Sequence, residues 1–443
     1  MNATIRLRLS VMFFLEYVIW GAWLPLLGLY LGASYLKFSG GQQAWIFNAF
    51  AIASLTGMFF GGQLADRYFS QEKFLAFSHL VGGLAMFGLA YVKAFWPFFG
   101  LMLLHCFFYV PTLSVTNAIA FANLKDAQKD FGFVRLWGTI GWIAASWPFI
   151  FIPIDWARVP AMAEGGGLLA WLGKALSTLK TGPAMEAALT STFIVSGVAS
   201  LALAAFCLFL PHTPPVKNEG SAFAPFEAIR LLAIPSILVL FIVTFFDSLV
   251  HYCYFFWTSR YLATLGLPEN WIAPAMSIGQ VMEIVAMATL GLFLKRLGWR
   301  LTMIIGILGQ GVRFLIYAFG SPELLWLVIA SNLVHGFAYA CFFATVYIFV
   351  DENFPKDVRT SAQGLFNLLI LGLGPFLGNF LWGWLGDVFT REVVVGGRAT
   401  KVIDFNHLFL VPLGFSLFAA ALLAVFFHPK RKEPVAEADP ALA

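Results

Sequence analysis

Long apolar runs alternate with short polar segments along almost the whole chain. Two examples are LRLSVMFFLEYVIWGAWLPLLGLYLG, which begins at Leu7, and NHLFLVPLGFSLFAAALLAVFFHP, which begins at Asn406. Each run exceeds the roughly 20 residues that a helix needs to cross the hydrocarbon core of a bilayer. The pattern therefore predicts an all-α polytopic membrane protein.

Twelve such spans are predicted, and one connection between them is long. That connection, residues 154–188, precedes the sixth span and is rich in Gly and Ala; its segment WLGKALSTLK is compatible with a short amphipathic helix on the outer surface. The predicted spans are residues 9–32, 44–64, 74–93, 97–123, 134–153, 189–210, 235–260, 270–294, 300–320, 322–350, 360–388 and 405–428.

The second half of the chain repeats features of the first at a nearly constant offset. GQLADRYFSQEK begins at Gly62 and GLFLKRLGWR at Gly291, 229 residues later, while HCFFY at His105 recurs as HGFAY at His335, 230 residues later. Such repeats predict two pseudo-symmetric six-helix bundles, which is typical of transporters that hold substrate near the membrane midplane. The expected units are an N-terminal bundle at 1–210, a cytoplasmic linker at 211–234, a C-terminal bundle at 235–428 and a cytoplasmic tail at 429–443.

Composition and charge agree with a membrane protein and predict its orientation. Hydrophobic residues make up 60% of the chain and charged residues 11%, whereas soluble proteins carry about 25% charged residues. With the N-terminus inside, the inner segments hold 17 Lys and Arg residues and the outer segments 9, with Arg313 inside the ninth span. This bias predicts that both termini are cytoplasmic. It also accounts for the net charge of +4 without a nucleic-acid surface.

The motifs of several other protein classes are absent from the sequence. The four cysteines fall inside predicted spans without metal-ligand spacing, and the first apolar run lacks the features of a cleavable signal peptide. There is no pair of histidines or cysteines with zinc spacing, no ATP-binding G-x-x-x-x-G-K-[ST] loop and no Gly-x-Ser-x-Gly. We therefore expect neither an enzyme nor a primary pump, and no metal or cofactor.

A few ionisable residues interrupt the apolar spans, and each is a functional hypothesis because charge is costly at membrane depth. Three sets share a helix face and pair a charge with a polar or aromatic neighbour, which suits a solute with hydroxyl groups and a flat ring. Two alternatives stay open: a structural ion pair for Glu283, and helix–helix hydrogen bonds for His105 and His335. The three sets are Gln280 with Glu283; Arg135 with Thr139 and Trp142; and Glu16 with Trp20 and Trp23. Asp247 and His251 share a face of the seventh span.

Arg135 and Glu283 belong to opposite halves of the chain, which suggests a mechanism. An ion pair between them across a central cavity can form and break as the halves move. Desolvation in a partly dry cavity favours the protonated form of a carboxyl group. Glu283 is therefore the first candidate for proton coupling, with Arg135 as its partner.

Two resemblances follow from quoted motifs. GQLADRYFSQEK resembles the loop between helices 2 and 3 of the major facilitator superfamily, which implies a gating role for Gly62, Asp66 and Arg67. Over nearly its whole length the chain resembles the bacterial nucleoside:proton symporter family of that superfamily. The matching blocks are WGAWLPLLG, YVPTLSVTNAIAF, RLWGTIG, MSIGQVMEI, RFLIYAFG and VRTSAQGLF.

The family resemblance implies a nucleoside site lined by Arg135, Thr139, Gln280 and Glu283, with aromatic rings at Trp142 and Tyr339. The sequence also departs from the family pattern. Ala340 stands where well-studied members carry an aspartate implicated in proton coupling, and Tyr252 and Phe255 align where they use amides. Glu16 stands where relatives have a neutral glutamine, so the protonatable group is hypothesised to have moved, with Glu16 a further proton-coupling candidate.

The leading expectation is a monomeric secondary transporter in the bacterial inner membrane that imports nucleosides with protons by alternating access. Its partners are a nucleoside, protons and the lipid bilayer, with no nucleic acid. Two alternatives within transport remain: another hydroxyl-rich solute such as a sugar derivative, or a facilitator without proton coupling. A receptor or scaffold that binds solute without moving it is a third, from a different class.

Overall fold

A computed structural model describes residues 3–125, 127–162, 167–214, 228–354, 356–395 and 398–428. The first half of the chain is helical apart from short connections. Its elements are α1 (Ala3–Leu31), α2 (Gly40–Tyr68), α3 (Gln71–Leu89), α4 (Phe95–Asn123), α5 (Ala127–Ser146), η1 (Trp147–Ile150), α6 (Leu168–Ser177), α7 (Pro183–Phe206) and η3 (Cys207–Phe209).

The second half adds one β-hairpin to its helices. The helical elements are η4 (Ala228–Ala233), α9 (Pro235–Thr264), α10 (Glu269–Ala318), η5 (Pro322–Leu324), α11 (Leu325–Ser331), α12 (Leu333–Tyr339), η6 (Ala340–Ala344), α13 (Thr345–Asn353), α14 (Lys356–Asn367), η7 (Leu368–Leu373), α15 (Gly374–Val388) and α16 (Phe405–Phe426). The antiparallel strands are β1 (Thr390–Val395) and β2 (Arg398–Ile403), with Thr390 opposite Ile403.

Each predicted span falls on a helix or on a run of helices. In the described chain, eight helical stretches are long and apolar enough to cross a membrane. One of these, α10, contains two predicted spans joined at Gly298, whose φ of 71° is the left-handed conformation that glycine adopts without strain. The tenth and eleventh spans contain the π-helical segments η6 and η7, which the apolar pattern did not reveal.

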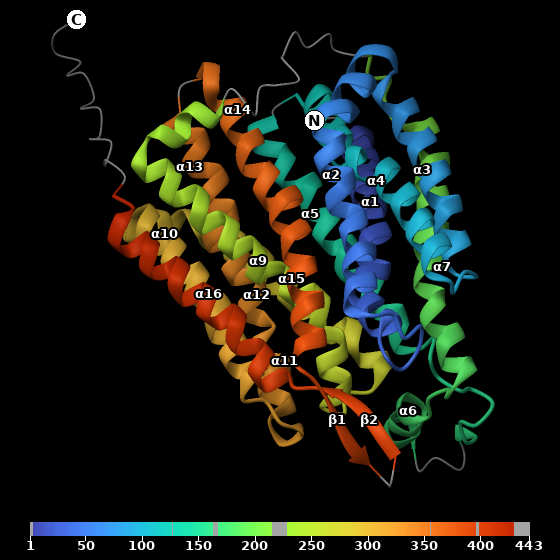
Figure 1. Ribbon diagram of the computed structural model, residues 1–443. Helices are drawn as coiled ribbons and strands as arrows, with labels where there is room; N and C mark the ends of the chain where they lie inside the picture. Colours follow the sequence, from blue (N-terminus) through green and yellow to red (C-terminus); the bar gives the residue numbers. More distant parts are fainter. Residues whose placement is uncertain are drawn as a thin grey trace, which may run out of the picture.

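The helices form two groups that face each other (Figure 1). In the first half, α1 packs against α5 and α7, α3 packs against α4 and α7, and α2 packs against α4. In the second half, α10 packs against α12 and α16, and α9 packs against α15 and α16. The two bundles meet where α1 contacts α9, α5 contacts α10 and α2 contacts α15.

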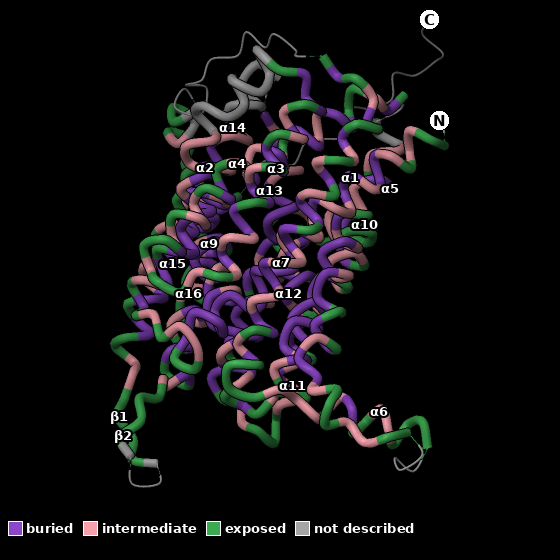
Figure 2. The backbone as a smooth tube through the Cα atoms, turned by 90° about the vertical axis from the view of Figure 1, so that its right-hand side faces the viewer, coloured by how far each residue is buried: buried purple, intermediate pink, exposed green. Residues whose placement is uncertain are grey.

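The β-hairpin and α6 lie at the end of the molecule opposite the start of α1, and both project from the helices (Figures 1 and 2). Helix α6 covers most of the segment expected to form a short helix. At the hairpin end several hydrogen bonds join the bundles. The Asn48 amide donates to the Phe376 carbonyl at 3.0 Å, the Asn379 amide donates to Asn48 at 2.9 Å, and Arg260 donates to Gln43 at 3.2 Å.

Glycines allow the bundles to approach closely at this end. The backbones of Gly40 on α2 and Gly383 on α15 lie so close that a Cβ atom on either would collide with the other's carbonyl group. Gly28 of α1 meets the backbone of Phe256 in α9 in the same way. Contact between helix backbones needs residues of this size, as in other membrane bundles.

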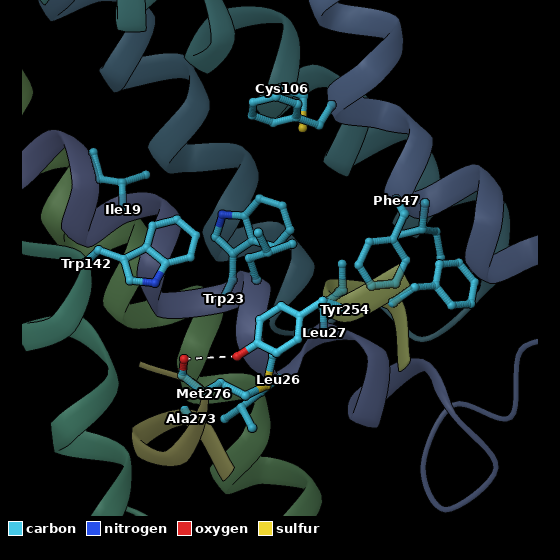
Figure 3. Close-up of a cluster of buried hydrophobic side chains, with 14 of the residues drawn as sticks. Ile19, Trp23, Leu26, Leu27, Phe47, Cys106, Trp142, Tyr254, Ala273 and Met276 are labelled. Carbon is cyan, nitrogen blue, oxygen red and sulfur yellow. Dashed lines mark hydrogen bonds between the residues drawn. The ribbon is translucent and has the colours of Figure 1, made fainter. Parts of the chain in front are cut away.

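Apolar side chains from both bundles form one continuous core next to these contacts. Figure 3 shows Ile19, Trp23 and Trp142 of the first bundle beside Tyr254 and Met276 of the second. The Tyr254 hydroxyl donates to the Met276 carbonyl at 3.0 Å, which satisfies the one polar group of that ring. The four cysteines are buried and free, as expected for small core residues.

Candidate functional site

Arg135 is held in place by an aromatic ring and a neighbouring glycine. Its guanidinium carbon lies 4.2 Å from the centre of the Tyr17 ring, a cation–π contact between α5 and α1. A Cβ atom at Gly138 would lie 2.8 Å from both the Arg135 Nη1 atom and the Tyr17 ring. The glycine therefore leaves the space in which this pair packs, and Arg135 and Thr139 both stay partly exposed.

Glu283 and Tyr339 approach the same place from the second bundle. Both side chains are partly exposed, and both interact electrostatically with Arg135. Among the described residues Glu283 forms no direct ion pair with Arg135. The two charges thus face one region from opposite bundles without being joined, and the alternative of a fixed structural ion pair is not what the structure contains.

The position of Glu283 depends on a close crossing of two helices. Gly336 of α12 packs directly on the Gly279 carbonyl and the Glu283 backbone of α10. One turn before Glu283, the Gln280 side chain is buried, and its amide nitrogen can donate to the Met276 and Ser277 carbonyls at 3.2 Å. The Gln280 side chain is therefore more deeply buried than the Glu283 side chain.

Aromatic rings from both bundles line the same region. The Trp142 ring centre is 5.1 Å from that of Trp20 and 6.3 Å from that of Phe255, which belongs to the opposite bundle. Phe255, Tyr252 and Tyr339 surround the His251 ring at centroid distances of 5.5, 5.6 and 5.8 Å. The structure therefore places the aromatic candidates from the fifth, seventh and tenth spans around one site.

Glu16 lies apart from that site, inside the first bundle. Its carboxylate accepts hydrogen bonds from His79 Nε2 at 2.8 Å and from the Thr112 hydroxyl at 2.7 Å, and it is fully buried. The Ser200 hydroxyl lies 3.2 Å from His79 Nδ1 and donates its proton to the His79 carbonyl at 2.9 Å. The Glu16 carboxyl group, the His79 ring and the Ser200 hydroxyl are thus joined in one chain of buried polar contacts. We call these residues, with Tyr109, whose hydroxyl donates to the Glu16 carbonyl oxygen at 2.9 Å, the N-cluster.

The second bundle contains a related group of buried polar residues. The Arg313 guanidinium donates to His335 Nδ1 and, at 2.7 Å, to Gln310, and it lies 4.4 Å from the Tyr254 ring. The His251 ring stacks on His335 at 4.9 Å. We call the buried residues Asp247, Gln310, Arg313 and His335, together with the partly exposed His251, the C-cluster.

Sequence analysis missed some of these residues and left others open. His79, an isolated ionisable residue in the apolar run FLAFSHLVGG, was detectable by the same criterion as the rest. Tyr17 gave no distinct signal among so many aromatic residues. His105 Nδ1 lies 3.1 Å from the Gly82 carbonyl, the helix–helix hydrogen bond considered as its alternative. Gly62, Asp66 and Arg67 lie in α2, but their side chains are outside the described residues.

Comparisons with known proteins agree on one family. The putative nucleoside transporter YegT of Escherichia coli (strain K12) is 31% identical over 96% of this chain and 94% of its own. The nucleoside permease NupG of the same organism is 27% identical over 97% of this chain and 98% of its own. A sequence model of the nucleoside H+ symporter family matches residues 1–164 and 166–432. The chain belongs to this family.

Solved structures confirm the fold. The crystal structure of the nucleoside transporter NupG matches with a TM-score of 0.78 and 25% identity, covering 97% of this chain and 100% of its own. A D-xylose-proton symporter, at 15% identity and a TM-score of 0.67, shares the fold alone. The major facilitator superfamily fold and a multi-pass membrane transporter rather than an enzyme are therefore confirmed.

Proposed function

We propose that this chain imports nucleosides together with protons across the bacterial inner membrane by alternating access. The observation that carries the proposal is that Arg135 and Glu283, from opposite bundles, reach one partly exposed site lined by aromatic rings. A site between two bundles changes when the bundles move relative to each other, as alternating access requires.

The chemistry of the site suits a nucleoside. Trp142 and Phe255 offer faces and edges to a planar base, and aromatic contacts of this kind favour flat rings. Thr139 and Glu283 supply groups that hydrogen bond to ribose hydroxyls, and Gln280 lies one turn behind Glu283. Tyr252 and Tyr339 add phenolic hydroxyls on the side of the second bundle.

Three residues are proposed for proton coupling. Glu283 takes up the proton, because an unpaired carboxyl group in a partly dry site is less costly when it is neutral. Arg135 is the opposite charge that Glu283 faces when it is ionised. Glu16 is the second candidate, and His79 is its proton-sharing partner. Glu283→Gln is expected to abolish accumulation driven by a proton gradient. Glu16→Gln tests the second candidate: unchanged coupling in that variant leaves Glu16 a structural role.

The organisation of the chain is also part of the proposal. The moving units are an N-terminal bundle at 1–210 and a C-terminal bundle at 235–428, joined by a cytoplasmic linker at 211–234, and the working form is a monomer with both termini in the cytoplasm. Gly62, Asp66 and Arg67 brace the cytoplasmic gate. The contacts that seal the hairpin end support access from the opposite, cytoplasmic end in this conformation.

A proton-independent facilitator is the second candidate, because Ala340 stands where relatives have an aspartate. Ala340 is buried at the first position of the π-helical segment η6 and has no titratable group. An uptake assay with and without a proton gradient separates the two functions. A facilitator equilibrates nucleoside without accumulating it, whatever proton gradient is imposed.

The decisive experiment is uptake of radiolabelled uridine and adenosine into proteoliposomes, with glucose as competitor and with or without a proton gradient. We expect accumulation above equilibrium only when the gradient is present, and no competition by glucose. Equilibration without accumulation would overturn proton symport and favour the facilitator. Competition by glucose would overturn the substrate class.

A further inference from the structure

The repeat that relates the two bundles extends to their buried polar residues. Asp247 on α9 follows Glu16 on α1 by 231 positions, and His335 on α12 follows His105 on α4 by 230. These offsets agree with the 229–230 residues that separate the repeated motifs. Asp247 therefore occupies in the C-cluster the place that Glu16 occupies in the N-cluster.

The cation of the C-cluster is bound to neutral groups. A guanidinium can only donate hydrogen bonds, so the Nδ1 atom of His335 accepts from Arg313, and the His335 ring is neutral with its proton on Nε2. The other hydrogen bond of Arg313 goes to the amide oxygen of Gln310. In the N-cluster, by contrast, the His79 ring lies 2.8 Å from the Glu16 carboxyl group.

Asp247 has no such partner. Its side chain is fully buried, and among the described residues neither carboxyl oxygen accepts or donates a hydrogen bond. A buried carboxylate without a compensating partner is strongly disfavoured, whereas the neutral acid avoids the cost of the charge. Arg313 is close enough to interact electrostatically with Asp247 without contacting it.

His251 follows Asp247 on α9 and contacts rings of the substrate site. It lies one helical turn after Asp247 on α9, so the two side chains share a face. The His251 ring is partly exposed, touches the Tyr339 and Phe255 rings, and has an Nδ1 atom without a hydrogen-bond partner in the described chain. A ring in this position can accept a proton from one side and release one to cavity water on the other.

We propose that Asp247 is a proton-binding residue of the C-terminal bundle that exchanges its proton with the central cavity through His251. The inference rests on the proton symport proposed above. In the present conformation Asp247 holds its proton as the carboxylic acid and Arg313 binds His335. When the proton leaves through His251 to water, the carboxylate draws Arg313 away from His335.

The release of His335 reaches the substrate site through a helix contact. His335 and Gly336 of α12 pack against α10 at Gly279, and Gly336 also touches the Glu283 backbone. A change in the Arg313–His335 contact therefore acts on the helix crossing that positions Glu283. Proton loss from Asp247 and the geometry of the nucleoside site are linked in this way.

The following titratable groups on the elements that pack against α9 are paired elsewhere, exposed, or in electrostatic contact with Arg313. On α15, Asp387 accepts a hydrogen bond from the Gly40 amide at the hairpin end of the molecule. On α16, His407 pairs with Asp404 at that same end. From η4, Arg230 is exposed before α9 begins, and from α1, Glu16 is paired with His79. The groups that interact with Arg313 or Asp247 are His251, Cys253, Tyr254, Tyr317 and His335.

The test compares two transport modes in proteoliposomes: counterflow of uridine without a gradient, and accumulation driven by an imposed proton gradient. Asp247→Asn is expected to keep counterflow within about twofold of the wild type and to lose gradient-driven accumulation. Asp247→Glu keeps a carboxyl group and is expected to accumulate nucleoside. The matched control is Glu186→Gln, which removes a carboxylate from an exposed pair with Lys93 and should leave both modes unchanged.

The outcomes separate this inference from the proposed function. Accumulation by Asp247→Asn at the wild-type level overturns the role of Asp247 and leaves proton symport standing. Absence of gradient-driven accumulation in the wild type overturns proton symport itself, and this inference with it. Loss of counterflow in both Asp247→Asn and Asp247→Glu assigns the residue a structural role and also overturns the inference.

Discussion

The two bundles treat equivalent buried carboxyl groups differently. In the N-cluster, the Glu16 carboxylate lies 2.8 Å from His79 and receives a second hydrogen bond from Thr112. In the C-cluster, Asp247 has no partner among the described residues, and Arg313 is bound to His335. In the first bundle the buried carboxyl group is hydrogen bonded to a basic side chain, while in the second it lies near Arg313 without contacting it. The comparison suggests that the first bundle is the more rigid frame and that the second changes state.

The largest effect is expected from breaking the buried Glu16–His79 pair of the N-cluster. His79→Leu leaves the Glu16 carboxyl group buried without this partner, and loss of one partner of a buried pair costs about 3–5 kcal/mol. Asp247→Asn removes no ion pair and should change stability far less. Thermal unfolding of the purified variants in detergent measures both. Equal loss of stability in the two variants would contradict the difference between the clusters.

The next effect concerns how closely helices cross in each bundle. Gly336→Ala forces a Cβ atom into the α10 backbone at Gly279 and Glu283, and overpacking of this kind costs about 1–3 kcal/mol. At Gly82 in the first bundle, a Cβ atom would lie 3.4 Å from His105 Nδ1, an ordinary contact. Gly82→Ala is therefore the matched control. The affinity for nucleoside and the unfolding temperature should both fall in Gly336→Ala and stay near the wild-type values in the control.

A smaller effect distinguishes the contributions of the bundles to base binding. Trp142→Ala removes a ring that packs against Trp20 and faces Phe255, and such aromatic contacts are worth about 0.5–1.5 kcal/mol. We expect the dissociation constant for uridine to rise about 2- to 12-fold. Phe255→Ala is the counterpart in the other bundle. Isothermal titration calorimetry measures both variants. A greater loss of uridine affinity in Phe255→Ala than in Trp142→Ala would place the base nearer the C-terminal bundle.

The smallest effect is expected outside the clusters. Lys93 and Glu186 form an ion pair at 2.7 Å, but the Lys93 side chain is 65% exposed. Exposed pairs contribute about 0–1 kcal/mol and are screened by salt. Glu186→Gln should leave the unfolding temperature nearly unchanged at high ionic strength. A loss as large as that of His79→Leu would show that unfolding does not report on buried charge.

The sequence predicted the features that depend on local pattern. Apolar run length located the spans, and the repeated motifs at Gly62 and Gly291 indicated two related halves. Arg135 and Glu283 were singled out because they are isolated on apolar helices of opposite halves, and their role in a shared substrate site stays a prediction. Such residues can be recognised individually because charge is rare and costly at that depth.

Features that depend on contacts between helices were not predictable in the same way. The partner of Glu16 is His79, 63 residues away on another helix, and sequence spacing does not specify which buried groups meet. The contact of Arg135 with Tyr17 depends on the space left by Gly138. The π-helical segments were not predicted either, because their apolar sequences are the same in kind as those of the neighbouring helices.

The contact of Gly40 with Gly383 bears on how easily the two bundles part at the hairpin end. Neither residue has a side chain, so parting them frees no rotamers and leaves no hydrocarbon pocket to be wetted. We therefore expect these two backbones to separate and close again with little rearrangement at the contact itself. A transporter must return its empty form to the starting conformation in every cycle. A contact that opens and closes easily favours a high turnover rate.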